Sequence, residues 1–270
     1  MSGSQASQPG AKATRGEVAE LLAAAEEWGR EAGEFTLRYY GHRVKFEDKL
    51  DGTPVTVADR GAEELLRARI SARFPDHAVL GEEYGESNAG ARVRWVLDPV
   101  DATRAFTRGV PIFGVLIGIE VAGEAVVGVA NFPALDELVA AGRGLGCRWN
   151  GEPCRVSDTE RVEDSLVLTT DVERVLKCPE GPGYRRLQQR ALFARTWGDC
   201  YGHCLVATGR AEIMVDPVMA SWDAGPFPTI VSEAGGRFTT IGGEVTMHGK
   251  SGVSTNGRLH DEVLRELATP

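Results

Sequence analysis

The sequence predicts an α+β half followed by an α/β half. Two amphipathic helices come first, at residues 17–40 and 59–74, because apolar side chains recur there at helical spacing. Strands separated by short turns follow at residues 113–121, 125–131 and 137–141. Strands and helices then alternate toward the C-terminus. A run of strands followed by such alternation is typical of these two fold classes in succession.

A glycine-rich hairpin is expected next, at residues 144–153. Strands are then expected at residues 165–170, 211–216 and 252–255, and helices at residues 184–193, 201–208, 224–233 and 260–267. Residues 1–15 are rich in small and polar side chains and lack an apolar signal core, so a disordered tail is expected there. We therefore divide the chain into this tail, an N-terminal half at 16–145 and a C-terminal half at 146–270.

Composition and charge restrict the function. The chain of 270 residues is 42% hydrophobic, enough for a large core, and has a formal net charge of −9. The acidic excess argues against nonspecific nucleic-acid binding, and no apolar run is long enough to cross a membrane. Five cysteines without a Cys-x-x-Cys motif are typical of reduced, buried thiols in a cytoplasmic protein. A metal site at Cys200 and Cys204 would need more ligands nearby.

The strongest chemical signal is the segment at 95–106, Trp-Val-Leu-Asp-Pro-Val-Asp-Ala-Thr-Arg-Ala-Phe. A β-rich stretch ends at Asp98 and Asp101, and the Thr103 hydroxyl and a helix-forming segment follow. Two such close carboxylates repel each other unless a cation or a proton intervenes. Hard oxygen ligands suit Mg²⁺, and the N–H groups at a helix start can hold a phosphate. The segment therefore indicates phosphate-ester hydrolysis, although Asp-Pro-x-Asp also occurs in ordinary turns and caps.

Other acidic side chains lie at the ends of strands or the starts of helices. Glu82 and Glu83 follow the apolar stretch at 78–80. Asp59 and Asp223 lie near predicted helix starts, where helix capping is the structural alternative to a catalytic role.

Together these segments resemble the inositol monophosphatase-like, metal-dependent phosphatases. The resemblance rests on Thr-Val-Ala-Asp at 56–59, Gly-Glu-Glu at 81–83, Asp-Pro-Val-Asp-Ala-Thr at 98–103, and Trp-Asp followed by Glu-Ala-Gly-Gly within 222–236. These segments occur in the family's order, and the resemblance spans residues 48–245. It implies the layered αβαβα sugar-phosphatase fold and a homodimer.

The resemblance also implies a metal site. Two Mg²⁺, with room for a third near Glu82, would clamp the attacking and leaving oxygens of a phosphate. The implied ligands are Glu82, Asp98, Asp101, Asp223 and the backbone carbonyl of Val100. Glu83 is expected to support these ligands without binding the metal. Lys49, on a polar loop at 45–52, either reaches the site or stays solvated.

The same resemblance assigns the catalytic groups. The Thr103 hydroxyl, held by Asp59, would orient or deprotonate the attacking water, and the N–H groups of Ala102 and Thr103 would hold phosphate oxygens. Most members of the family have glycine at the position of Ala102. If this position needs a positive φ, alanine costs on the order of 1 kcal/mol; in a first helical turn it costs nothing.

One further segment resembles the histidinol-phosphate phosphatase branch: Gly-Asp-Cys-Tyr at 198–201, followed by Leu-Val-Ala-Thr-Gly-Arg-Ala at 205–211. Histidinol phosphate carries an ammonium and an imidazole, so an extra carboxylate would favour it. Asp199 could supply that charge and Asp216 another, although Asp199 could instead cap the next helix. The substrate is therefore expected to be a small phosphorylated metabolite.

Three alternatives to this substrate stay open. The nearest is an inositol-phosphate phosphatase with relaxed specificity, and the next is a fructose or nucleotide bisphosphate phosphatase. A regulatory member associated with RNA or polymerase is the alternative from a different class. The complete set of acidic ligands argues against a purely regulatory role.

Overall fold

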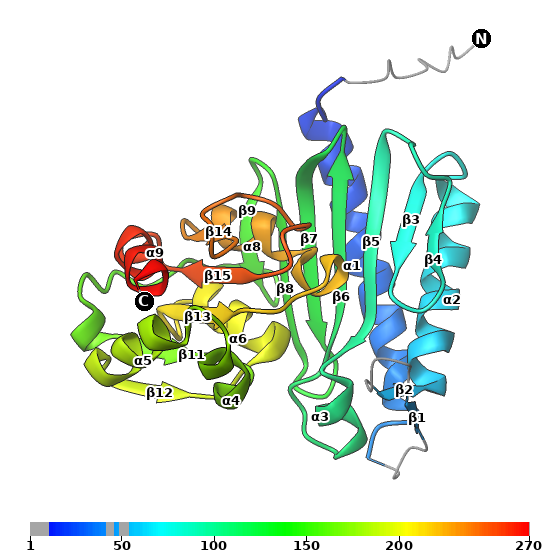
Figure 1. The fold of residues 1–270 in the computed structure, drawn as a ribbon. Helices are drawn as coiled ribbons and strands as arrows, with labels where there is room; N and C mark the ends of the chain where they lie inside the picture. The colour runs from blue at the N-terminus through cyan, green and yellow to red at the C-terminus, as the bar shows by residue number, and fades with distance from the viewer. Residues whose placement is uncertain (1–10, 42–45, 49–53, 270) are drawn as a thin grey trace.

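Two sheets and three helical layers stack in the order helix, sheet, helix, sheet, helix (Figure 1). The computed structural model describes residues 11–41, 46–48 and 54–269. This stacking is the layered αβαβα arrangement that the resemblance implies, so the predicted fold class is confirmed.

The larger sheet contains eight strands. In spatial order they are β10 (Glu152–Pro153), β9 (Gly146–Trp149), β8 (Glu137–Gly142), β7 (Glu124–Phe132), β6 (Gly114–Val121), β5 (Val93–Asp101), β3 (Ala78–Gly81) and β4 (Gly85–Ser87). Only the β3–β5 pair in this sheet is parallel. The predicted meander and the hairpin after it are therefore confirmed, and the hairpin extends this sheet beyond residue 145.

Helices α1 (Arg15–Leu37) and α2 (Val57–Arg73) cover the outer face of this sheet (Figure 1). The helix α1 begins two residues earlier than predicted, because the Thr14 side chain caps it by accepting the Glu17 N–H. Its predicted apolar side chains, including Leu21 and Trp28, are buried against β6, β7 and β8.

A small two-stranded sheet joins these helices. Strand β1 (Phe46–Asp48) pairs antiparallel with β2 (Pro54–Thr56). The polar loop predicted at 45–52 thus contains a strand, because its backbone pairs with the residues before α2. Lys49 lies outside the described residues, as do residues 1–10 of the predicted tail.

The middle layer consists of α6 (Asp199–Ala207), α7 (Ser221–Ala224) and α8 (Phe227–Glu233), which pack against the larger sheet. The single helix predicted at 224–233 is wrong in its start. Gly225 and Pro226 keep helical dihedrals, but Pro226 has no N–H to continue the hydrogen bonds of α7, so α8 begins at Phe227. The backbone of Gly225 packs directly against β6 of the larger sheet. A Cβ on Gly118 would lie 2.4 Å from the Gly225 carbonyl oxygen, so only glycine fits at that position.

The smaller sheet contains five strands. In spatial order they are β12 (Phe193–Arg195), β11 (Leu166–Leu168), β13 (Ile213–Asp216), β15 (Gly252–Thr255) and β14 (Arg237–Thr239). The outer layer beyond it comprises α4 (Val172–Lys177), α5 (Gly181–Arg190) and α9 (His260–Ala268), after the short 3₁₀ helix η1 (Val162–Asp164).

The helix predicted at 184–193 ends earlier than expected. Its last residue is Arg190, and Phe193 lies in β12, because the chain pairs with β11 through Leu166 and Phe193. Among the residues that the structure describes, none of the helices combines the length and the apolar character that a bilayer crossing requires.

Candidate metal-dependent active site

A bulge in β5 brings the two carboxylates of the Asp-Pro-Val-Asp segment to one side. Asp98 pairs with Leu116 and Asp101 with Gly114, so β5 has one residue more than β6 between these pairs. In a regular strand, residues three apart face opposite sides of the sheet. The extra residue reverses that alternation, and both side chains can therefore serve one site.

Carboxylates from both halves of the chain meet in a cavity of about 450 Å³. Carboxylate oxygens of Asp98, Asp101 and Asp223 all lie within 4.8 Å of one another. Glu82, Val100, Ala102, Thr103 and Asp199 also line the cavity. The structure thus brings together all the predicted metal ligands and, of the other predicted site residues, Ala102, Thr103 and Asp199.

Backbone N–H groups hold each clustered carboxylate in place. Asp98 accepts the Val100 N–H at 3.1 Å, and Asp223 accepts the Ala220 N–H at 2.8 Å. Asp101 accepts the Cys200 N–H at 2.8 Å, from the first turn of α6. None of these residues is a helix N-cap: Asp223 is the third residue of α7, whose N-cap is Ala220. The carboxylates are therefore positioned before any ligand arrives.

Burial and mutual repulsion make these carboxylates unfavourable as anions. Burial raises the pKa of Asp98 and of Asp101 well above the ordinary value, and neighbouring carboxylates raise both further. The pKa of Asp223 is raised to about 6, first by burial. A divalent cation with oxygen ligands would relieve this repulsion, so the residues present fit the Mg²⁺ that the resemblance implies.

Glu63 fixes the segment that carries Glu82, and the sequence analysis missed it. Its fully buried carboxylate accepts the N–H groups of Glu83 and Tyr84 at 2.8 and 3.2 Å and the Arg67 Nε–H at 2.8 Å. Glu83 itself does not line the cavity among the described residues, and its backbone serves this anchor. The sequence did contain a signal for Glu63: it is a carboxylate on the face of the predicted helix that otherwise carries buried core residues.

Thr103 and Asp59 lie beside the clustered carboxylates. The Thr103 hydroxyl lies 3.0 Å from the Val100 carbonyl oxygen and 3.5 Å from Asp59 Oδ1. Asp59 is buried at the third position of α2 and accepts both the N–H and the hydroxyl of Thr56, which is the N-cap. Burial, the largest cause, raises the pKa of Asp59 to about 6. Asp59 thus takes part in capping while facing Thr103.

Ala102 adopts the left-handed conformation. Its φ is 63° and its ψ is 45°, and it is the N-cap of α3 (Thr103–Thr107). The position of Ala102 therefore does need a positive φ, which was the first of the two expectations. Alanine is strained in this conformation, whereas glycine would not be.

Asp199 opens α6 inside the same cavity. Its φ is 50°, and the N-cap is Gly198, so the alternative that Asp199 is the N-cap is wrong. The Asp199 N–H donates to the Thr170 hydroxyl at 2.7 Å. Burial, followed by repulsion from Asp216 and Asp223, raises the pKa of Asp199 to about 7. A cation near this side chain would therefore be strongly favoured.

Asp216 lies behind Asp199 at the end of β13. It accepts the Thr170 hydroxyl at 2.9 Å and the Thr170 N–H at 3.2 Å, and it lines a smaller cavity of about 100 Å³ beside the main one. Thr170, which the sequence analysis missed, thus connects Asp216 to the backbone of Asp199. Its position just after a buried parallel strand was the signal for it.

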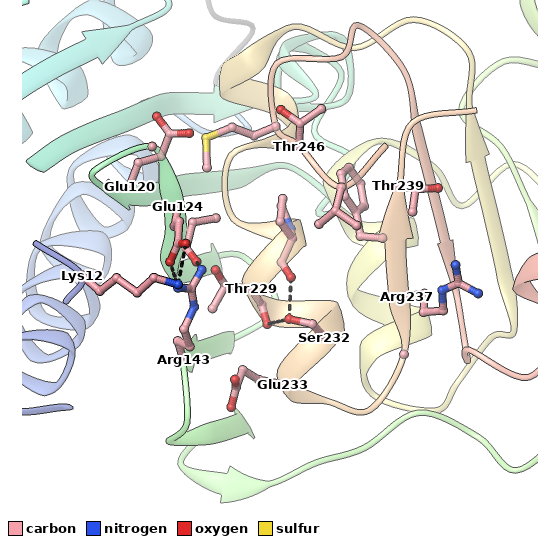
Figure 2. Close-up of a pocket in the computed structure, with 17 residues that line it drawn as sticks. Lys12, Glu120, Glu124, Arg143, Thr229, Ser232, Glu233, Arg237, Thr239 and Thr246 are labelled. Atoms are coloured by element: carbon pink, nitrogen blue, oxygen red, sulfur yellow. Dashed lines mark hydrogen bonds and ion pairs between the residues drawn. The ribbon is translucent and has the colours of Figure 1, made fainter. Parts of the chain in front are cut away.

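A larger cavity, of about 560 Å³, lies elsewhere, between the β6–β7 turn, α8 and β14. In Figure 2, Lys12 and Arg143 both approach Glu124, with nitrogen–oxygen distances of 3.1 and 2.5 Å. Glu233 accepts the N–H groups of Gly144 and Gly146, and Arg237 pairs with Asp261. Within the described residues, the charged side chains of this cavity already have partners, so its size does not make it the reactive site.

A model of the inositol monophosphatase family matches residues 17–269. The chain belongs to this family. Members of the family are metal-dependent phosphatases, and the acidic cluster of Asp98, Asp101 and Asp223 agrees with that dependence.

Similar proteins have been given several names. The chain is 46% identical to a histidinol-phosphatase of Chlorobaculum parvum, over 91% of this chain and 96% of the relative. A histidinol-phosphatase of Mycobacterium tuberculosis is 35% identical, over 86% and 91%. A fructose-1,6-bisphosphatase/inositol-1-monophosphatase of Thermotoga maritima is 32% identical, over 87% and 91%.

Solved structures agree with the fold. The extragenic suppressor protein suhB of Bartonella henselae superposes with a TM-score of 0.86 at 27% identity, covering 93% of this chain and 99% of that one. The protein is therefore an enzyme of the inositol monophosphatase family, a phosphomonoesterase.

Proposed function

We propose that this enzyme hydrolyses L-histidinol phosphate to L-histidinol and inorganic phosphate, with Mg²⁺ as its metal. The observation that carries the proposal is Asp199, a partly buried carboxylate that lines the same cavity as Asp98, Asp101 and Asp223. The phosphate of this substrate would bind next to the metal ligands, and its cationic nitrogen would pair with Asp199. The 46% identity to a protein named histidinol-phosphatase supports the same assignment.

The metal side is assigned to Glu82, Asp98, Asp101, Asp223 and the Val100 carbonyl. Bound Mg²⁺ would neutralise charge on the phosphate oxygens and lower the pKa of water. The N–H groups of Ala102 and Thr103 are assigned to the phosphate oxygens.

The water-activating pair is assigned to Thr103 and Asp59. When the Thr103 hydroxyl donates to Asp59, and not to the Val100 carbonyl, a lone pair on its oxygen can accept a proton from water while its own proton moves to Asp59. Asp59, with a pKa of about 6, is mostly ionised at neutral pH and can take the proton that Thr103 passes on. No covalent intermediate is required in this scheme.

The substrate side is assigned to Asp199, with Asp216 as its support. Thr170 holds the Asp199 backbone through one hydrogen bond and donates to Asp216 through another. These two hydrogen bonds fix the position of the Asp199 backbone. We therefore assign Asp216 two roles, positioning Asp199 and adding negative charge to the pocket.

The test is phosphate release with Mg²⁺ from histidinol phosphate, inositol 1-phosphate, fructose 1,6-bisphosphate and phosphoadenosine phosphate. We expect the highest kcat/KM for histidinol phosphate. No hydrolysis of it, with good hydrolysis of inositol 1-phosphate, would establish the nearest alternative instead. No hydrolysis of any ester would favour the regulatory alternative.

Replacing Asp199 should separate the substrates. Asp199→Asn should lower kcat/KM for histidinol phosphate about ten- to a hundredfold, because a charge pair of about 1.5–3 kcal/mol is lost. Glycerol 2-phosphate, which has no amine, should be hydrolysed almost as before. Asp171→Asn is the matched control, since Asp171 lines the exposed part of the cavity and caps α4, which Asn also does. Equal losses on both substrates would show that Asp199 is structural.

Two further expectations belong to this proposal. The resemblance supports a homodimer, and sedimentation equilibrium would contradict it by giving a monomer mass.

We also propose the division into halves at 16–145 and 146–270. Strands β9 and β10 lie beyond residue 145 but belong to the larger sheet, so the exact boundary needs a test. Limited proteolysis that cleaves between Pro153 and η1, and not near 145, would move the boundary.

A further inference from the structure

Two cysteines face each other on the β9–β10 hairpin, outside the cavity described above. The sulfur atoms of Cys147 and Cys154 lie 3.4 Å apart. The hairpin turns at Asn150 and Gly151, whose φ values are 51° and 85°, which is typical of a tight two-residue turn. Trp149 pairs with Glu152 and Arg148 with Pro153, so Cys147 and Cys154 are the next residues outward on the two strands.

The backbone holds the two cysteines opposite each other. The Cys154 N–H donates to the Cys147 carbonyl oxygen at 3.1 Å, one position beyond the last ladder pair. Residues directly opposite in an antiparallel pair have Cα atoms about 4.5–5.5 Å apart, within the span of about 4.4–6.8 Å that a disulfide bridges. The sulfurs need to approach only from 3.4 Å to about 2.05 Å, which side-chain rotation supplies.

The two thiols have different surroundings. Cys147 is buried, whereas Cys154 is partly exposed. The hydrogen bond with Cys147, and then the positive charge of Arg210, lower the pKa of Cys154. Arg210 is fixed there by Glu137 at 2.8 Å and lies with its guanidinium carbon 4.2 Å from the centre of the Trp149 ring. Cys154 is therefore the more accessible and more acidic thiol, and Cys147 is its buried neighbour.

We propose that Cys147 and Cys154 are a dithiol site that a peroxide oxidises to a reversible intramolecular disulfide. The Cys154 thiolate attacks the peroxide, so that an S–O bond forms, the O–O bond breaks and hydroxide leaves to be protonated. The Cys147 sulfur then attacks the Cys154 sulfenic acid, so that the S–S bond forms and the S–O bond breaks. This second step releases the sulfenic oxygen as water with the Cys147 proton. Two thiols are oxidised, and one hydrogen peroxide is reduced to two waters.

The other cysteines do not offer this geometry. Cys200 and Cys204 are buried in α6, and the Cys178 sulfur donates to the Arg174 carbonyl oxygen at 3.3 Å. Within the described part of the chain, no other two cysteine sulfurs form a hydrogen bond like that between Cys147 and Cys154. The site is therefore specific to the hairpin, and Cys178 provides a matched control for partial exposure alone.

The test is oxidation of the folded, full-length protein by hydrogen peroxide, followed by blocking of free thiols and non-reducing trypsin digestion. Trypsin cleaves after Arg143, Arg148 and Arg155, so each cysteine lies in its own short peptide, 144–148 or 149–155. We expect the two peptides to appear as one linked species, and dithiothreitol to separate them. Two of the five thiols should be lost.

Variants sharpen the test. Cys154→Ser and Cys147→Ala should each abolish the linked species, and Cys178→Ser should leave it unchanged. The wild-type digest decides the proposal even if a variant fails to fold. A disulfide to Cys204, a disulfide between two chains, oxygen addition to Cys154 without a cross-link, or a cross-link formed only after unfolding in urea would each overturn it.

Discussion

The carboxylate cavity and the cavity of Figure 2 both gather acidic side chains, but they balance the charge in different ways. Around Glu124, the side chains of Arg143 and Lys12 hold the carboxylate and lower its pKa. Around Asp98 and Asp101, burial and then repulsion from other carboxylates raise both pKa values, and the hydrogen bonds from Cys200 offset the rise at Asp101 only in part. The second cavity is the larger, at about 560 Å³ against about 450 Å³. Unrelieved repulsion, and not volume, therefore distinguishes the reactive site.

The largest difference should appear when one acid is neutralised in each cavity. Asp101→Asn should lower kcat for phosphate release on the order of 10²–10³-fold, because it removes charge from the proposed metal site. Glu124→Gln should change kcat less than about twofold, because only exposed ion pairs, those with Lys12 and Arg143, are lost. Steady-state assays with saturating Mg²⁺ check both. A similar loss in both variants would abolish the distinction between the cavities.

The next effect concerns Glu63, which supports the carboxylate cavity without lining it. Glu63→Gln should weaken Mg²⁺ binding by about tenfold, because the Glu83 and Tyr84 N–H groups lose a charged acceptor and the Glu82 segment shifts. Isothermal titration calorimetry with Mg²⁺ measures this change. Glu31→Gln, which removes an ion pair with Arg69 on the same helix but away from this segment, is the control. An unchanged dissociation constant would mean that Glu63 serves folding alone.

The pH dependence of stability should also differ between the cavities. The pKa values of Asp59 and Asp223 are raised to about 6. Between about pH 4 and pH 6 the metal-free native state therefore binds more protons than the unfolded chain, so the free energy of unfolding should fall as the pH rises. A pKa shift of about two units corresponds to about 3 kcal/mol for one carboxyl.

Urea unfolding in EDTA across this pH range measures that fall. Added Mg²⁺ should reduce it, and Asp223→Asn should flatten it by removing one of the titrating groups. Glu124→Gln serves as the comparison, because the pKa of Glu124 is lowered and its contribution has the opposite sign. Stability that increases steadily from pH 4 to pH 6 in EDTA would contradict the account of the carboxylate cavity.

The smallest expected effect is the strain at Ala102. Ala102→Gly should raise the free energy of unfolding by up to about 1 kcal/mol, because glycine adopts a φ of 63° without steric cost. Ala105→Gly, in the same short helix α3, should lower it by about 1 kcal/mol. Chemical denaturation at fixed Mg²⁺ concentration compares the two. Destabilisation by both substitutions would mean that the left-handed conformation is not strained.

Local sequence patterns were sufficient for several of the elements and for the chemistry of the metal ligands. The apolar spacing in α1 and α2, the turn residues of the β9–β10 hairpin, and the segment of Asp98 and Asp101 can be recognised without any tertiary contact. Helix spacing and turn conformation depend on a few neighbouring residues, so the sequence alone determined them. It also determined that Mg²⁺ was the expected metal, since that follows from the type of ligand.

Only the tertiary structure decided which groups hold the ligands. The Cys200 N–H reaches Asp101 across 99 positions of sequence, and Thr170 reaches Asp216 across 46. The end of the helix predicted at 184–193 likewise depended on a distant strand, whereas the break before α8 follows from Pro226 itself. The bulge in β5 reversed the side of one carboxylate, and a one-residue change in register cannot be read from composition or spacing. Such contacts depend on how two sheets and their helices pack, and that information is spread over the whole chain.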